Sequence, residues 1–202
     1  YAWSVYDWLD GSPATAAGIA DQQGLGAQLA DFLVALRGVD ATEGPRPGVH
    51  NWYRGGTLRT YDDIARGALD RLAGHVDVDR AAAVWHEALE ADWNGEDTWF
   101  HGDLAAGNLL LSDSRLTGVI DFGTCGVGDP SCDLAIAWTL LDEAGRHVFR
   151  DRLGVDDSAW TRGRGWTLWK TLSGLASAVE DADEDDAAPV LRVVEALLAC
   201  DA

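Results

Sequence analysis

The sequence has no methionine and only one lysine, Lys170. Its three cysteines, Cys125, Cys132 and Cys200, include no C-x-x-C pair, so reduced thiols are expected rather than disulfides or a zinc site. Residues 1–9 have no basic start before an apolar core, and no apolar run approaches the roughly 20 residues that cross a bilayer. We therefore expect a cytoplasmic protein with no membrane partner. Because methionine is absent, the sequence is not expected to begin at its own translational start.

Positive charge is also scarce. The chain has 15 lysines and arginines against 34 aspartates and glutamates, a formal net charge of −19. Such a surface repels nucleic-acid backbones and anionic membranes, so neither is expected as a partner, whereas cationic partners stay open. A bias toward alanine, aspartate and glycine accounts for most of this acidity. With 47% hydrophobic and 24% charged residues, the 202-residue chain has the composition of a globular protein with one substantial core.

The hydrophobic pattern predicts an α+β fold, mainly α, with a central β-hairpin. Residues 1–9 are aromatic with a β-branched centre and precede the breaker at 10–13, which predicts one strand and a turn. Two apolar runs, 109–111 and 116–120, flank the turn-rich residues 112–115 and predict a hairpin with a longer loop. Helices are predicted at about residues 21–39, 61–75, 78–93, 130–141, 158–179 and 187–200, with a broken loop at 41–60.

Residues 99–134 contain most of the groups that could carry chemistry. His101, Asp103 and Asn108 follow the pattern H-x-D-x-x-x-x-N just before a predicted strand. In phosphoryl transfer, a carboxylate orients the attacking hydroxyl and can accept its proton, while an amide oxygen can bind magnesium. Asp121 ends the return strand, and antiparallel pairing would bring it near Asn108. Magnesium takes only one or two protein carboxylates, so these two oxygen donors suit that ion.

Three neighbouring polar residues are interpreted as structural. Asp129 precedes Pro130 and is expected to cap the helix that begins there. Asp133, one turn later, is expected to hold backbone N–H groups of the loop that carries Asp103. His101 is expected to buttress that loop, although a role as a base is the alternative.

Three segments carry a family resemblance: HGDLAAGNLL at 101–110, GVIDFG at 118–123 and GDPSCDLA at 128–135. Together they resemble the Brenner-type motif and the metal motif of the aminoglycoside phosphotransferase family, which implies the C-terminal lobe of a protein-kinase-like fold. The resemblance implies that Asp103 is the catalytic base or hydroxyl-orienting group and that Asn108 and Asp121 bind Mg²⁺. It also implies ATP or GTP as donor and a small hydroxylated acceptor, with an aminoglycoside as the namesake.

The N-terminal residues carry a weaker resemblance. SVYDWLDG at 4–11 resembles the last strand and the hinge of that family's N-terminal lobe, so residues 1–12 are interpreted as its remnant and 13–202 as the helical lobe. A simple edge strand is the alternative. The nucleotide contacts that the resemblance implies are Asp7, Trp8 and Leu9.

The chain also departs from the family pattern. No nucleotide-covering loop with its phosphate-contacting lysine is visible, and Lys170, on a late helix, is not assigned that role. The chain alone is therefore expected to be a poor catalyst.

Two alternatives to an aminoglycoside kinase stay open: a non-catalytic lobe that binds a ligand or partner, and a kinase for a macrolide, a choline-like alcohol or another sugar. A protein kinase is disfavoured because the gap from Gly123 to Asp129 is too short for an activation segment.

Two further features bear on the acceptor. Most tryptophans are expected to pack the core, but Trp52, Trp138 and Trp166 are alternative pocket-lining residues. The acidic run at 181–186 is expected to be a solvated link between helices. Its alternative role is to attract a cationic amino sugar.

Overall fold

The computed structural model describes residues 3, 7–14, 18–181 and 184–199, without the side chains of residues 184–186. Helices dominate, and the strands are short, as predicted for an α+β fold that is mainly α. One antiparallel sheet has the order β1 (Ser12–Pro13), β3 (Leu109–Ser112), β4 (Arg115–Val119), and β2 (Thr98–Phe100) pairs with β5 (Gly126–Gly128). The described α-helices are α2 (Gln22–Arg37), α3 (Asp62–Arg71), α4 (Val78–Glu90), α5 (Ile136–Thr139), α6 (Glu143–Leu153), α7 (Asp157–Glu180) and α8 (Glu184–Ala199).

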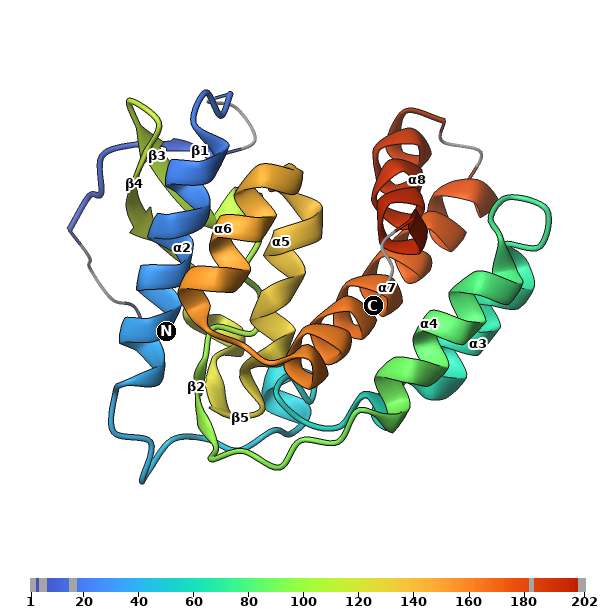
Figure 1. Cartoon of the computed structure of the whole chain (residues 1–202), viewed down its shortest axis with the longest axis horizontal. Coiled ribbons are helices and arrows are strands. Elements are labelled where there is room, and N and C mark those ends of the chain that lie inside the picture. Colours follow the sequence, from blue (N-terminus) through green and yellow to red (C-terminus); the bar gives the residue numbers. More distant parts are fainter. Residues whose placement is uncertain (1–2, 4–6, 15–17, 182–183, 200–202) are drawn as a thin grey trace.

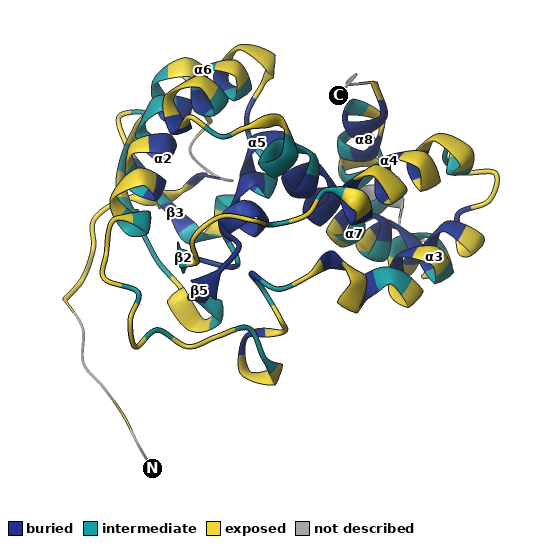
Figure 2. Cartoon of the chain, turned by 60° about the horizontal axis from the view of Figure 1, so that its bottom comes forward, coloured by how far each residue is buried: buried dark blue, intermediate teal, exposed yellow. Residues whose placement is uncertain are grey.

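Helix α7 runs between two groups of elements. On one side lie α2, α5, α6 and the β1-β3-β4 sheet, and on the other lie α3, α4 and α8 (Figure 1). Helix α7 packs against α3, α4 and α8, while α2 packs against α6. The buried residues follow α5 and α7 through the middle of the molecule (Figure 2). The core therefore continues from one group of helices to the other through α7.

Two glycines let α7 approach its neighbours closely. A Cβ atom at Gly163 would lie 2.5 Å from Leu134 Cβ, and one at Gly165 would lie 2.4 Å from Ala88 Cβ. Glycine inside a helix costs about 1 kcal/mol relative to alanine, so its presence here is explained by packing rather than by helix propensity. The close contacts bring the helix α7 backbone against α4 and against the segment that follows Asp129.

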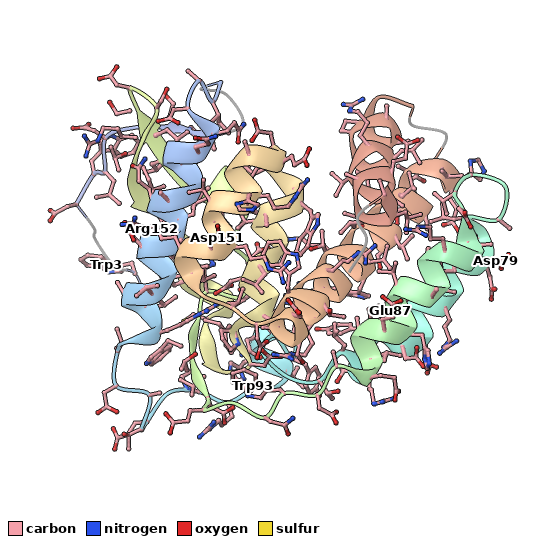
Figure 3. The ribbon with its side chains drawn as sticks, in the orientation of Figure 1. Trp3, Asp79, Glu87, Trp93, Asp151 and Arg152 are labelled. Carbon is pink, nitrogen blue, oxygen red and sulfur yellow. The ribbon has the colours of Figure 1, made fainter. Side chains whose placement is uncertain are left out.

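Buried arginines of α7 alternate with these glycines. Arg162 Nε donates to Asp129 Oδ2 over 2.7 Å in an ion pair whose side chains are 7% and 6% exposed. The Arg162 guanidinium also lies 5.2 Å from the ring centre of Trp93, which is labelled in Figure 3. Arg164 Nε donates to Leu197 O of α8 over 3.0 Å. The alternation of arginine and glycine thus joins α7 to the elements on both sides.

Helices α2 and α6 are also joined at the surface. Arg152, labelled in Figure 3, is on α6, and its Nε and Nη2 atoms donate to the carboxylate of Asp31 on α2 over 2.5 and 2.8 Å.

No helix within the described ranges is long and apolar enough to span a bilayer. Cys125 and Cys132 are free thiols, as expected, and Cys132 is buried; Cys200 lies outside the described residues.

The hairpin is confirmed, but its connection is shorter than predicted. Strands β3 and β4 are joined by Asp113 and Ser114 alone, with φ values of 49° and 62°. Positive φ at both central residues matches the right-handed twist of paired strands, so a two-residue turn suffices. A register shift between Leu110 and Leu111 marks a bulge next to the turn.

Three other predictions need correction. Residues 7–9 are in no strand, and residues 1–2 and 4–6 of the predicted strand lie outside the described residues. The described strand in this region is β1, inside the predicted turn, where it pairs with β3. The predicted helix from 130 to 141 is a 3-10 helix, Pro130–Ala135, followed by the short α5, because tight turns are common where helices begin.

Helix α6 and the β2-β5 pair were not predicted from the sequence. The buried residues of α6 are Gly145, Phe149 and Leu153. Because Gly145 has no apolar side chain, only two apolar residues mark the buried face of this helix in the sequence. Strands β2 and β5 have three residues each, which is too short for a pattern of alternation. Helices α2, α3, α4, α7 and α8 lie where they were predicted, with differences of a few residues at their ends.

Candidate active site

The loop that carries Asp103 begins where β2 ends. Gly102 has φ = 84°, and a Cβ atom there would lie 2.4 Å from Thr124 O. Both the positive φ and the close backbone contact require glycine. The H-G-D motif therefore has a structural reason for its middle residue, which turns the chain sharply before Asp103.

Asp133 supports this loop from behind. His101 N and Gly102 N each donate to its carboxylate over 2.8 Å, and the side chain is fully buried. Burial raises the pKa of Asp133, and the two hydrogen bonds oppose that rise because they stabilise the charged form. The predicted structural role of Asp133 is confirmed. The predicted role of Asp129 as the cap of the helix that begins at Pro130 is confirmed too, since Asp129 Oδ1 accepts a hydrogen bond from Ser131 N over 3.0 Å.

His101 uses both ring nitrogens within the protein. Asp103 N donates to its Nδ1 over 3.3 Å, and its Nε2 lies 3.0 Å from Ile120 O. Because Nδ1 accepts a hydrogen bond, Nε2 carries the proton and donates to the carbonyl oxygen. The ring is buried, so His101 ties the loop to the end of β4 and has no nitrogen left to act as a base. This agrees with the structural interpretation.

Asp103 and Asn108 face each other across the loop. Asn108 Nδ2 donates to Asp103 O over 2.8 Å and lies 3.5 Å from Asp103 Oδ2. A carbonyl oxygen can only accept, so the amide nitrogen must face Asp103, and Oδ1 of Asn108 is left for another ligand. The Asp103 side chain is 36% exposed and can therefore be reached by a substrate.

The hairpin brings Asp121 back beside Asn108. Leu109 pairs with Val119, and Ile120 N donates to Asn108 O over 2.9 Å. Asp121 itself has left-handed backbone angles, φ = 63° and ψ = 64°, a conformation that aspartate tolerates better than most residues. Such strained conformations concentrate at functional sites. The placement agrees with the geometry expected from antiparallel pairing, while the metal role of both residues stays a prediction.

The donor set fits magnesium better than a transition metal. Across the described ranges, no group of three or more His, Cys, Asp or Glu side chains could hold an ion. Magnesium is usually bound by one or two protein carboxylates, with phosphates and water completing its octahedron. One carboxylate from Asp121 and one amide oxygen from Asn108 match that requirement.

A cavity of about 830 Å³ opens beside Asp121. It lies between the N-terminal segment and the β3-β4 hairpin, on the side where the hairpin ends in Phe122 and Gly123. The structure thus brings the predicted nucleotide contacts and one predicted metal ligand to the same cavity, although the roles of these residues stay predictions. The lining residues that bear on the argument are Asp7, Trp8, Leu9, Leu110, Ile120 and Asp121.

Two cations at this site were not identified from the sequence. Lys170 Nζ on α7 lies 2.6 Å from Asp103 Oδ1, and Arg54 Nε donates to Gly102 O over 3.0 Å. Partial burial alone would raise the pKa of Asp103. The hydrogen bond and charge of Lys170, with the charge of Arg54, outweigh that effect and hold the pKa below its ordinary value. Lys170 is 67 positions from Asp103, and no local pattern in the sequence relates the two.

An aromatic cluster fixes Arg54. Its guanidinium lies 4.7 Å from the ring centre of Trp169, and the ring centres of Tyr61 and Trp169 are 4.0 Å apart.

Three other tryptophans were considered as lining an acceptor pocket. Trp138 and Trp166 are only 4% and 3% exposed, so that alternative is wrong for both. Trp52 is 70% exposed and can still meet a ligand.

A protein-family model described as the phosphotransferase enzyme family, APH, matches residues 1–166. The chain belongs to this family. The order of its motifs and the placement of Asp103, Asn108 and Asp121 around one hairpin agree with the resemblance found in the sequence.

Curated members of the family are similar over part of the chain. An aminoglycoside 3′-phosphotransferase from Escherichia coli is 31% identical over 93 residues, which are 39% of this chain and 32% of that protein. An aminoglycoside 3′-phosphotransferase from Salmonella typhimurium is 44% identical over 61 residues, which are 30% of this chain and 22% of that protein. The chain therefore spans about a third or less of the length of these curated relatives.

Solved structures extend the likeness to almost the whole chain. The GDP and kanamycin complex of APH(2″)-IIIa matches with a TM-score of 0.65 at 17% identity, covering 95% of this chain and 69% of that one. Macrolide 2′-phosphotransferase type I matches with a TM-score of 0.59 at 19% identity, covering 98% and 69%. At this identity the likeness establishes the fold, which is the kinase-like fold of these phosphotransferases, as predicted.

Proposed function

We propose that the chain forms the acceptor and metal side of an O-phosphotransferase that moves the γ-phosphate of ATP or GTP to a hydroxyl of a small molecule. The arrangement of Asp103, Asn108 and Asp121 at the open end of the β3-β4 hairpin, opposite its turn, carries this proposal. It combines an accessible carboxylate with two oxygen donors of the kind that magnesium takes. The buried support from Asp133 and His101 holds the carboxylate's loop in place before any ligand binds.

In the proposed step, Asp103 accepts a hydrogen bond from the acceptor hydroxyl and directs its oxygen at the phosphorus. A bond forms between that oxygen and the phosphorus, and the bond from the phosphorus to the bridging oxygen of the nucleoside diphosphate breaks. The hydroxyl proton passes to Asp103. Phosphoryl transfer has a loose transition state in which orientation matters more than proton abstraction, so a carboxylate with a lowered pKa is adequate.

The donor and its ion are proposed to bind on the hairpin side of Asp103. Asn108 Oδ1 and the Asp121 carboxylate would hold Mg²⁺, which supplies positive charge to the phosphates. Asp7, Trp8 and Leu9 are proposed as nucleotide contacts because they line the cavity beside Asp121. Nucleotide complexes of structural neighbours, with GDP and with AMP-PNP, support nucleotide use.

The proposed acceptor is an aminoglycoside-like amino sugar. The curated relatives named as aminoglycoside 3′-phosphotransferases and the neighbour solved with kanamycin support this choice. The macrolide 2′-phosphotransferase neighbour supports a macrolide as the second candidate. We also propose that these 202 residues alone transfer phosphate poorly. Their one lysine, Lys170, is paired with Asp103 and does not line the cavity proposed for the nucleotide, so it is not placed to contact the phosphates.

The test is phosphate transfer to a panel of aminoglycosides, macrolides and choline, measured on the complete product of the gene and on these 202 residues. We expect transfer to one class of acceptor, with Mg²⁺ required. Replacing Asp103→Ala should lower kcat by about 10³-fold or more, because the hydroxyl loses its orienting carboxylate, while nucleotide affinity stays within about twofold. Asp113→Ala, a carboxylate in the hairpin turn, is the control and should keep full activity.

Two results would contradict the proposal. Full turnover in Asp103→Ala would remove the catalytic assignment. Saturable acceptor binding by the complete product without any transfer would indicate a ligand-binding module instead of an enzyme.

A further inference from the structure

We propose that Lys170 is a positioning residue for phosphoryl transfer: its ammonium holds Oδ1 of Asp103, so that Oδ2 faces the acceptor hydroxyl. This inference rests on the proposed phosphotransferase function. It adds a group from α7, outside the three motifs, to the machinery around the hairpin.

The pairing is selective. The chain has one lysine and 34 acidic residues, and that lysine contacts the candidate catalytic carboxylate over 2.6 Å. The two side chains are 46% and 36% exposed, and an exposed ion pair contributes only about 0–1 kcal/mol to folding. Stability therefore gives little reason for the contact, whereas a role in orienting the carboxylate gives a direct one.

The two oxygens of Asp103 have different surroundings. Oδ1 is bound by Lys170, while the contact that the structure shows for Oδ2 is Asn108 Nδ2 at 3.5 Å, the outer limit of a hydrogen bond. The terminal torsion of aspartate is soft, so an unheld carboxylate exchanges its oxygens and turns away from one fixed direction. The bond to Lys170 breaks this equivalence and leaves one oxygen for the hydroxyl.

Rigid neighbours set the distance between the lysine and the carboxylate. Leu168 and Leu172 of α7 are fully buried on either side of Lys170. Trp169, the preceding residue, packs on Arg54, and Arg54 in turn donates to Gly102 O beside Asp103. The helix with the ammonium and the loop with the carboxylate are therefore joined a second time, and sites supported in this way hold their geometry well.

The test compares Lys170→Met with Lys170→Arg in the complete gene product, using the acceptor that the wild type phosphorylates. Lys170→Met should lower kcat by about 10–100-fold, the usual effect of misplacing a reacting group, with KM for acceptor and nucleotide within about threefold. Lys170→Arg, which keeps a cationic donor, should recover most of the loss. The matched control is Arg71→Met, which removes an ion pair between a 46% exposed arginine of α3 and Glu180 of α7, the helix that carries Lys170, and should leave kcat unchanged. Melting temperatures of all variants should lie within about 3 °C of each other.

Each other outcome contradicts the inference. If Asp103→Ala is inactive but Lys170→Met keeps or exceeds wild-type kcat, Lys170 does not position the base, and the phosphotransferase proposal survives alone. A rise in KM with unchanged kcat would make Lys170 a binding residue. Equal losses in the Met and Arg variants with a lower melting temperature would show a structural role. A wild type with no transfer to any acceptor would overturn the proposed function and, with it, this inference.

Discussion

Asp133 and Asp103 serve the same loop from opposite sides. Asp133 is fully buried and accepts two backbone N–H groups, whereas Asp103 is 36% exposed and pairs with Lys170, which is 46% exposed. A buried carboxylate whose oxygens are used by the backbone cannot reach a substrate, and an exposed one contributes little to folding. Two residues of the same type in neighbouring motifs are thus placed differently: Asp133 holds the loop, and Asp103 stays accessible for the role in phosphoryl transfer that we propose for it.

The same division extends to the surrounding side chains. Behind the loop, Asp129 and Arg162 form an ion pair that is almost fully buried. In front of it, Asp121 ends the hairpin at the cavity, and Lys170 remains 46% exposed. Substitutions behind the loop should therefore act first on stability, and substitutions in front should act on turnover.

The largest loss of stability is expected at the buried ion pair. Asp129→Ala leaves the Arg162 guanidinium buried without its carboxylate and removes the cap on Ser131 N, so the free energy of unfolding should fall by about 3–5 kcal/mol. Urea denaturation measures this directly. The double variant Asp129→Ala with Arg162→Met should lose less than the sum of the two single variants, because no unpaired charge remains. Strict additivity would show that the pair is not coupled.

Next comes the direct contrast between the two aspartates. Asp133→Ala leaves the N–H groups of His101 and Gly102 buried without an acceptor, which should cost about 2–4 kcal/mol of unfolding free energy. Asp103→Ala should change it by less than about 1 kcal/mol, because the pair with Lys170 is exposed. Equal losses in the two variants would break the proposed division between support and chemistry.

The smallest of these effects concerns the packing of α7. Gly163→Ala would place a Cβ atom 2.5 Å from Leu134 Cβ and should destabilise the protein by about 1–3 kcal/mol through overpacking. Gly174→Ala is the matched control on the same helix, where a new Cβ meets nothing within 4 Å, and it should stabilise by about 0.5–1 kcal/mol. Thermal melts of both variants would show opposite shifts, and a loss at Gly174 equal to that at Gly163 would contradict the close-packing explanation.

The features that local sequence determines were predicted well. The helices α2, α3, α4 and α7 follow apolar residues at helical spacing, and the hairpin follows two apolar runs around a turn. The capping role of Asp129 and the loop-holding role of Asp133 followed from their places near the start of a helix. Such features depend on residues within a few positions of one another, which a pattern can report.

Contacts between distant segments were decided by the tertiary structure alone. Nothing near Lys170 in the sequence indicates that it meets Asp103, and nothing near Arg54 indicates that it holds Gly102 from 48 positions away. The pairing of β1 with β3 likewise joins segments about a hundred positions apart. The family, the candidate catalytic carboxylate and the proposed metal donors could be identified from the sequence, because they lie in contiguous motifs. Only packing around α7 decided which cations stand beside that carboxylate, because their placement depends on where whole helices come to rest.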